Sequence, residues 1–591
     1  MTRLLSPNPP GRRTRFGAAL VVVAFAACSA QTAPRSSSSV AGLATGGLNL
    51  EAGDSVNSSL GDYLAGNFAL ESGLLAEAAS YFERALVKDP DNPDLRRQLF
   101  LLILASGRYD TALEHAGALV AEDAGVAEAQ LLLTLDEVRA GRFGDAHRRL
   151  QAMAEEGVAG LTVPFIDAWV LFAQDRGNGV DDARVRLDQG EALGPLNGYH
   201  KAMMLDLSGR LDQAAPALSS AMPESGPAPL RMLRAYASML ARQDRHQEAI
   251  EIIRQQLADR GEQPELADLM TTLATGGSPQ PPFADAAGGM ADALLGIAEA
   301  LHQERGNRMA VVYARLAMFA RPELAEAALL IGDMMAEQEN FEAAIAAYQA
   351  VDPGSPLSFL ADLRRARALH DMEREDAAFE LLERLAAAEP EHIDALVQLG
   401  DLLRNDDRYD ESEKAYTRAI ERIGEPGPEH WTLFYARGIT YERTKRWPEA
   451  EKDFLYALEL EPEQPFVLNY LGYSWVDMGM HLDRAKGMLH RAVELRPDDG
   501  FIVDSLGWVH FRLGDYDAAV EQLERAVELE PGDPVINDHL GDAYWRVGRQ
   551  REARYQWRRA LTLEPEADTV ADIEEKLRQG LPKPDEGPSR T

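Results

Sequence analysis

The chain repeats itself with a period near 34 residues, and this repeat limits the folds open to it more than any other feature. Three consecutive copies near the C-terminal end carry large, glycine, alanine and proline positions in the same order. The matching sets are Leu468, Leu471, Gly472, Ala485, Leu489, Ala492 and Pro497; Val503, Leu506, Gly507, Ala519, Leu523, Ala526 and Pro531; and Asn537, Leu540, Gly541, Ala553, Trp557, Ala560 and Pro565. A period of this length is typical of helix pairs stacked into an elongated solenoid.

Small residues mark where the two predicted helices of each unit touch. Glycine recurs at the eighth place, as at Gly507, although it costs about 1 kcal/mol relative to alanine in a helix interior. Its recurrence therefore indicates a close approach of the partner helix. Alanine at the twentieth place, as at Ala519, indicates the same from the second helix, and the residue at the twenty-seventh place, as Ala526, is expected to face the next unit. Proline near the end of the unit stops the second helix.

These units predict an all-α fold, an α-solenoid of about 14 helix pairs with a C-terminal capping helix. The segment from Gly276 to Pro282 cannot continue a helix and interrupts the pattern. We expect a divergent N-terminal block over 59–274, an inserted loop or hinge over 275–290 and a middle block over 291–430. A regular C-terminal block over 431–565, a capping helix over 566–579 and a disordered tail over 580–591 complete the prediction.

The N-terminus has the layout of a secretory signal. Arginines precede a short apolar run from Phe16 to Ala27, and the run is too short to span a bilayer, which needs about 20 residues. Phe25-Ala26-Ala27-Cys28 resembles a bacterial lipobox, although leucine is usual at the place of Phe25. The resemblance implies a signal peptide over 1–27 and lipidation of Cys28; the alternative is a plain signal peptide with an incidental cysteine. Residues 28–58 are predicted to form a flexible tether.

The lipobox resemblance also implies a location. A lipoprotein with Ser29 after the acylated cysteine is expected at the outer membrane, facing the periplasm. The alternative is a soluble periplasmic or secreted protein. Several acyl chains would hold the chain stably, so we expect contact with the membrane only through this anchor.

Charge and motif content exclude several function classes. The formal net charge of −36 disfavours nucleic acid and anionic surfaces as partners. The sequence lacks a His-Glu-x-x-His pair, a phosphate loop and a nucleophile elbow, and it has one cysteine. We therefore predict no enzyme activity, no catalytic residues, no cofactor, no metal and no small-molecule substrate. The oligomeric state stays open.

The repeat positions are similar to those of the tetratricopeptide repeat family over about residues 59–565. The resemblance implies a right-handed superhelix whose first helices line a concave groove for peptide segments of partner proteins. Eleven residues of the last block fall at the family's groove-facing places: Tyr435, Asn469, Tyr473, Asp504, Trp508, Phe511, Arg512, Asp538, Asp542, Trp545 and Arg546. Aromatic rings beside Asn, Asp and Arg are typical of a protein-binding surface. Alternatively, several of the rings only fill gaps between adjacent helices.

Two functions fit this combination of repeat and anchor. In the first, the chain is a non-enzymatic adaptor, similar to the repeat lipoproteins that bring substrates to a periplasmic protease and so regulate cell-wall hydrolases. In the second, it is a structural component of an outer-membrane assembly, polysaccharide export or pilus biogenesis machine. Both rest on a likeness of fold and anchor rather than on a reactive site.

Overall fold

The chain is an all-α solenoid, as the repeat predicted. The computed structural model describes residues 59–582 except 72, 123–124, 155–156, 175–179, 189–193, 224–227 and 261–263. Of the described residues, 79% are helical and none lies in a strand. The described residues contain 30 helices, which follow one another along the chain in pairs apart from α13 and α30. The predicted signal peptide, Cys28, the tether up to residue 58 and residues 583–591 of the predicted tail lie outside the described residues.

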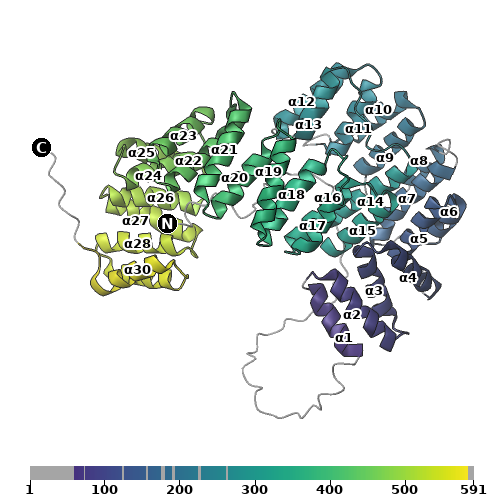
Figure 1. Cartoon of the computed structure of the whole chain (residues 1–591), viewed down its shortest axis with the longest axis horizontal. Coiled ribbons are helices and arrows are strands. Elements are labelled where there is room, and N and C mark those ends of the chain that lie inside the picture. The colour runs from purple at the N-terminus through teal and green to yellow at the C-terminus, as the bar shows by residue number, and fades with distance from the viewer. Residues whose placement is uncertain are drawn as a thin grey trace, which may run out of the picture. The chain divides into compact units, whose positions relative to one another are not determined.

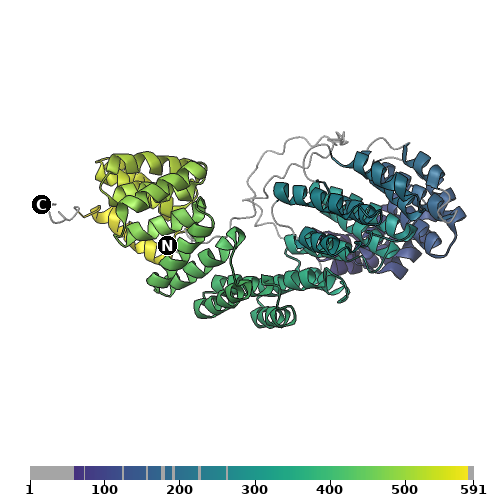
Figure 2. The same ribbon diagram turned by 90° about the horizontal axis from the view of Figure 1, so that it is seen from above.

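The described residues form two compact units, 59–378 and 379–582. In each unit, successive helix pairs lie side by side (Figures 1 and 2). The first unit contains α1 (Ser59–Glu71), α2 (Leu75–Lys88), α3 (Pro93–Ala105), α4 (Tyr109–Glu122), α5 (Ala127–Arg139), α6 (Phe143–Gln151), α7 (Gly157–Gln174), α8 (Val180–Asp188), α9 (Gly194–Leu207), α10 (Leu211–Ala221), α11 (Leu230–Ala241), α12 (His246–Arg260), α13 (Pro264–Ala274), α14 (Ala286–Gln303), α15 (Asn307–Ala320), α16 (Ala325–Glu337), α17 (Phe341–Gln349) and α18 (Ser358–Asp371).

The second unit begins within α19, and its repeats are the most regular of the chain. It contains α19 (Glu375–Ala388), α20 (Asp394–Asn405), α21 (Tyr409–Ile423), the 3₁₀ turn η3 (Pro428–His430), α22 (Trp431–Arg443), α23 (Trp447–Leu460), α24 (Pro465–Asp477), α25 (Leu482–Leu495), α26 (Gly500–Arg512), α27 (Tyr516–Leu529), α28 (Pro534–Arg546), α29 (Gln550–Leu561) and α30 (Ala567–Gln579). The predicted capping helix is α30.

Asn and Asp side chains start the first helices of several units. The Oδ1 atom of Asn92 accepts from the backbone N–H of Leu95 at 3.1 Å, at the start of α3. The Oδ1 atom of Asp533 accepts from Val535 and Ile536 at 2.8 and 3.0 Å, at the start of α28. Such caps satisfy backbone donors that the first helical turn leaves free. A proline then occupies the first helical position, where its missing N–H costs nothing.

The glycine at the eighth place packs as the sequence predicted. A Cβ atom added to Gly332 would lie 2.2 Å from Cε1 of Tyr348, and one added to Gly507 would lie 2.6 Å from Cγ of Leu523. Both neighbours stand on the second helix of the same pair. Any larger side chain at these glycines would push the two helices apart.

One recurrent position escaped the sequence analysis, because its residue type varies. The turn between the two helices of a pair takes a left-handed backbone, with φ of 81° at Gly514 and 85° at Gly548. Lys445 occupies the same place in an earlier unit with φ of 61°. A non-glycine residue tolerates this conformation at some cost, and the packing of the flanking helices holds it there.

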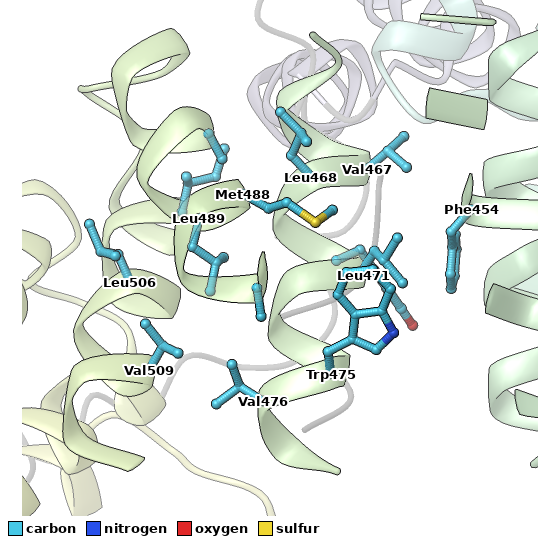
Figure 3. Close-up of a cluster of buried hydrophobic side chains, with 14 of the residues drawn as sticks. Phe454, Val467, Leu468, Leu471, Trp475, Val476, Met488, Leu489, Leu506 and Val509 are labelled. Atoms are coloured by element: carbon cyan, nitrogen blue, oxygen red, sulfur yellow. The ribbon is translucent and has the colours of Figure 1, made fainter. Parts of the chain in front are cut away.

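The core of the second unit runs continuously through its helix pairs. Figure 3 shows α24 at its centre, with Trp475 and Leu471 on the side of Phe454 and Leu489 and Leu506 on the other side. Every one of these side chains is buried. Because each pair contributes side chains to both neighbours, this cluster extends over several repeats, and a second cluster around Leu540 and Trp557 continues it toward α30.

The interruption at residue 275 is shorter than the sequence predicted. Helix α14 begins at Ala286, so residues 286–290 of the predicted loop or hinge are helical. The carboxylate of Asp285 caps this helix by accepting from the N–H of Gly288 at 2.8 Å. Gly288 and Gly289 are buried, and they serve close helix packing rather than a turn.

The predicted tail also begins later than expected. Gly580 is buried and ends α30 with φ of 74°, and a Cβ atom there would lie 1.9 Å from the ring of Trp545. The next residues stay close, because the carbonyl of Pro582 accepts from Nη1 of Arg546 at 2.6 Å. Residues 580–582 are therefore packed onto α28.

Helix α7 is the one helix, among those described, with the length and composition to cross a membrane. It lies inside the first unit, where Val163, Ile166, Trp169 and Val170 are fully buried, and it packs against α6, α8 and α14. These contacts describe a core helix of the solenoid.

Candidate protein-binding surface

The predicted groove residues of α22 and α24 lie partly beneath the surface. Tyr435 is buried, and its ring centre lies 5.8 Å from that of Tyr470 and 6.0 Å from that of Phe454. Tyr473 is also buried, and burial raises the pKa of its hydroxyl. Asn469 is only half-buried. The two tyrosines therefore fill space between helices, and Asn469 stays accessible.

Trp508 stands in the middle of an aromatic stack on α26 and α28. Its ring is nearly parallel to that of Phe511, with centres 4.8 Å apart and an angle of 12°. It is also nearly parallel to the imidazole of His539, with centres 4.0 Å apart and an angle of 17°. Trp508 and Phe511 remain half-buried. The stack holds a large aromatic surface in one orientation, which lowers the entropy cost of binding to it.

A buried carboxylate fixes the imidazole of this stack. Both carboxylate oxygens of Asp504 lie 3.0 Å from Nδ1 of His539. Burial lowers the pKa of His539, but the carboxylates of Asp504, Asp538 and Asp542 outweigh it, so the pKa lies above its ordinary value. A protonated imidazole beside the tryptophan ring adds a cation–π attraction to the stack. His539 was not among the predicted site residues, although the sequence places it next to Asp538.

Arg512 is exposed at the edge of the same surface. Its Nη1 atom donates to Oδ1 of Asp477, in the preceding repeat, at 3.0 Å. Phe466, Met478 and Leu513, which the sequence analysis did not select, are large apolar side chains left exposed on α24 and at the ends of α24 and α26. We call Asn469, Trp508, Phe511 and Arg512, together with the buried Tyr473 and Asp504 beneath them, the central aromatic face.

The remaining predicted residues, all on α28, bind other parts of the chain. Nζ of Lys576, on α30, lies 2.7 Å from Oδ2 of Asp538 and 3.1 Å from Oδ2 of Asp542. Burial, followed by the charge of Asp538, raises the pKa of Asp542 to about 7, and Lys576 partly offsets this rise. Trp545 packs on Gly580, and Arg546 donates to Pro582. The structure therefore separates these four residues from the central aromatic face.

The first helices of the N-terminal unit are covered by the chain's own α14 and α15. These two helices pack on α3, α5, α7 and α9 (Figure 1). A Cβ atom at Gly289, on α14, would lie 2.3 Å from the indole of Trp169, on α7. Nε of Arg315, on α15, donates to the carbonyl of Ala105 at 3.0 Å, and the hydroxyl of Tyr109 donates to the carbonyl of Arg315 at 3.1 Å.

Polar contacts extend this covered surface toward α9 and α11. Arg231 forms an ion pair with Glu299 and lies 3.9 Å from Oδ1 of Asp292. Nε2 of His200 lies 3.8 Å from Oδ2 of the same Asp292. Burial raises the pKa of Asp292 to about 6 and lowers that of His200 to about 3. Residues of α9, α11 and α14 therefore form one buried polar cluster.

Several segments of the chain match known repeat models. Residues 69–135, 363–428 and 397–465 match models described as tetratricopeptide repeat, and residues 507–548 match a model described as TPR repeat. The chain contains tetratricopeptide repeats. The matched segments lie in both units, and they include most of α26 and α28.

The repeats are also similar to those of other proteins. The TPR repeat-containing protein PA4667 of Pseudomonas aeruginosa is 26% identical over 186 residues, a match that spans 31% of this chain and 30% of that protein. Among solved structures, the Cut9–Hcn1 hetero-tetramer of the APC/C has 14% identity and a TM-score of 0.37, covering 89% of this chain and 97% of that one. Yeast Tom70 has 13% identity and a TM-score of 0.29, covering 88% and 95%.

The tetratricopeptide repeats of the two units thus differ in what their first helices contact. In the N-terminal unit, α14 and α15 occupy the surface of α3 to α9. In the C-terminal unit, α30 engages α28, whereas Trp508, Phe511 and Arg512 on α26 keep exposed area. Among the residues described, no group of three or more His, Cys, Asp or Glu side chains is arranged to hold a metal ion.

Proposed function

We propose that this chain is a non-enzymatic scaffold that binds a segment of a partner protein on the central aromatic face. The observation that carries the proposal is the half-exposed stack of Phe511, Trp508 and His539, held in place by Asp504. Rigid aromatic side chains next to an arginine dominate the binding energy of many protein interfaces. In the N-terminal unit α14 and α15 cover first helices, whereas side chains of this face on α26 keep exposed area.

Asn469 supplies a polar anchor for the same segment. Its Oδ1 atom is buried and has no hydrogen-bond partner among the residues described. An unmet acceptor of this kind costs about 1–3 kcal/mol. A rotation of the Asn469 amide would bring this oxygen to the surface, where a backbone N–H of an extended peptide can donate to it while side chains of the peptide cover Trp508 and Phe511. This arrangement would fix the register of the peptide without requiring a particular sequence at that point.

Removal of the central ring should weaken partner binding strongly. We expect Trp508→Ala to raise the Kd of a captured partner protein at least about tenfold, since tenfold corresponds to 1.4 kcal/mol and buried aromatic anchors commonly exceed it. The partner is isolated by cross-linking and affinity capture with the full chain, and its Kd is measured by surface plasmon resonance.

Trp447→Ala is the matched control for this experiment. Trp447 is also half-buried but stands at the start of the second helix α23, where its ring centre lies 6.4 Å from that of the buried Phe454. We expect its replacement to leave the Kd within about twofold, with helical circular dichroism unchanged in both variants. Equal Kd values for wild type and Trp508→Ala would remove the central aromatic face from the proposal.

We propose further that Cys28 carries the lipid anchor and that the chain acts in the periplasm as an adaptor for a protease or cell-wall hydrolase. The support is the position of the chain's one cysteine directly after an apolar run and two alanines. Stable anchoring by several acyl chains would keep the repeats at the membrane.

Replacement of this cysteine should release the chain from the membrane. We expect Cys28→Ala to move it from the membrane fraction to the soluble fraction after cell lysis and ultracentrifugation, with metabolic labelling by a palmitate analogue lost. A chain that stays with the membrane would contradict acylation as the anchor. Recovery of a secretin or outer-membrane barrel, rather than a protease or hydrolase, with the wild-type chain would favour the structural role instead.

A further inference from the structure

Helix α29 is basic in a strongly acidic chain. It carries Arg551, Arg554, Arg558 and Arg559 against one acid, Glu552, whereas the whole chain has a net charge of −36. The places 34 residues earlier, on the neighbouring second helix α27, hold Asp517, Glu521, Glu524 and Arg525 in positions that match 551, 555, 558 and 559. Two of these four places therefore change from an acid to an arginine, and a third changes from an acid to a tyrosine.

One side of α29 is buried in the stack, and the opposite side is exposed to solvent. Ala553, Trp557 and Ala560 are fully buried and hold the helix in the stack. Arg554 belongs to the fold as well, because its Nη1 atom donates to the carbonyl of Leu577 at 3.2 Å and its guanidinium lies 5.5 Å from the ring centre of Trp545. We call the outer residues Arg551, Tyr555, Arg558 and Arg559 the basic face of α29.

The basic face has charge that the rest of the described chain does not neutralise. Arg551 and Arg558 are exposed and form no ion pair with any described residue. Glu552 forms an ion pair with Arg549, whose Nε atom lies 3.3 Å from Oε1 of Glu552. Some other arginines of this unit pair with acids, as Arg418 does with Glu383 at 2.7 Å. Tyr555 lies between the two free guanidinium groups and is 66% exposed.

We propose that the basic face of α29 docks a short, extended acidic segment of a partner protein. Arg551 and Arg558 stand seven residues apart, about 10 Å along the helix at 1.5 Å per residue. In a polyproline-II segment, residues three apart lie on the same side at a spacing of about 9 Å. Two carboxylates at that spacing can each pair with one guanidinium, and Tyr555 packs against the backbone between them.

The width of the basic face favours a short segment over a long polyanion. Glu524 of α27 pairs with Arg549, just before α29, at 2.8 Å. Asp517 and Glu521 stand on the same helix α27, so acidic residues border the basic face on that side. A nucleic acid or an anionic bilayer would extend over these acids and be repelled by them. The basic face shares no residue with the central aromatic face, so the two proposals stand independently.

A labelled peptide tests this assignment on the full chain. We expect the peptide Pro-Glu-Pro-Pro-Glu-Pro, carrying fluorescein, to bind the wild-type chain in fluorescence anisotropy, and the same peptide with Gln in place of Glu to bind at least fivefold more weakly. The double variant Arg551→Gln, Arg558→Gln should bind the acidic peptide at least fivefold more weakly than wild type. Binding should weaken as salt rises from 50 to 150 mM, because exposed charges are screened.

A matched double variant separates the basic face from the overall charge. Arg374 and Arg384 are exposed and form no ion pair among the described residues, so Arg374→Gln, Arg384→Gln changes the net charge equally. We expect this control to bind the acidic peptide within twofold of wild type. Equal loss in both double variants would overturn the proposal. So would tighter binding of a six-nucleotide DNA strand, or of vesicles containing phosphatidylglycerol, than of the acidic peptide.

Discussion

Gly289→Ala should destabilise the N-terminal unit by about 2 kcal/mol, although alanine is the better helix former. The added methyl group would lie 2.3 Å from the indole of Trp169, which is fully buried and cannot move aside. Overpacking of this kind costs about 1–3 kcal/mol. The change would separate α14 from α7 and loosen the surface that covers the first helices. Hydrogen exchange of peptides from α7 and α14, followed over a urea series, measures the effect.

Gly487→Ala is the control for this substitution. Gly487 lies inside α25, where no atom is within 4 Å of an added Cβ. Alanine there should stabilise its helix by up to about 1 kcal/mol, from helix propensity and the lower entropy of the unfolded chain. The two variants therefore have opposite expected signs. Stabilisation by Gly289→Ala would show that α14 does not pack tightly against Trp169.

Lys576→Met should destabilise the last repeat by about 3 kcal/mol at pH 8. The side chain of Lys576 is 11% exposed and lies between Asp538 and Asp542, which are 10% and 6% exposed. Removal of the ammonium group leaves two buried carboxylates without a cation, and breaking a buried ion pair in this way costs about 3–5 kcal/mol. Hydrogen exchange of peptides from residues 534–579 measures the loss.

The effect of Lys576→Met should depend on pH. The pKa of Asp542 is raised to about 7 in the folded chain, against about 3.9 for an unfolded aspartate. Between these two pKa values the folded chain keeps a proton on Asp542 that the unfolded chain releases. The free energy of unfolding therefore falls as pH rises from about 4 to about 7. At pH 5 Asp542 already carries its proton, so the variant should lose less than at pH 8. An equal loss of stability at pH 5 and pH 8 would show that Asp542 does not titrate between these pH values in the folded chain.

Arg578→Met gives the comparison for the same helix. Arg578 is 64% exposed on its side chain, and its contact with Glu574 is 3.8 Å long. An exposed pair of this kind contributes about 0–1 kcal/mol. We therefore expect little change at either pH, although the net charge changes as in Lys576→Met.

The sequence predicted the features of the fold that repeat. The glycine at the eighth place and the buried alanines recur because each unit must pack on its neighbour in the same way. Gly507 against Leu523 is one example. The turn residue with positive φ could not be found in this way, because its residue type differs between repeats. Lys445 and Gly514 have the same backbone conformation but different side chains.

Contacts that occur only once in the chain could not be predicted from the repeat pattern. The repeat positions place Asp538, Asp542, Trp545 and Arg546 on the first-helix side of the last pair, but they do not show that α30 and residues 580–582 pack there. Likewise, nothing in the pattern places α14 and α15 on α3 to α9. The stack of Trp508 on His539 depends on side-chain orientation, which a spacing rule leaves open.

The covered first helices of the N-terminal unit also change how that unit should unfold. In an open solenoid each repeat touches only its neighbours, so the ends fray and stability adds up along the chain. Here Tyr109 bonds to Arg315 and Asn340 to the carbonyl of Gly73, across 206 and 267 residues. Such non-local contacts have a high contact order and form late. The unit should therefore lose its structure in one cooperative step, as a globular domain does, rather than repeat by repeat.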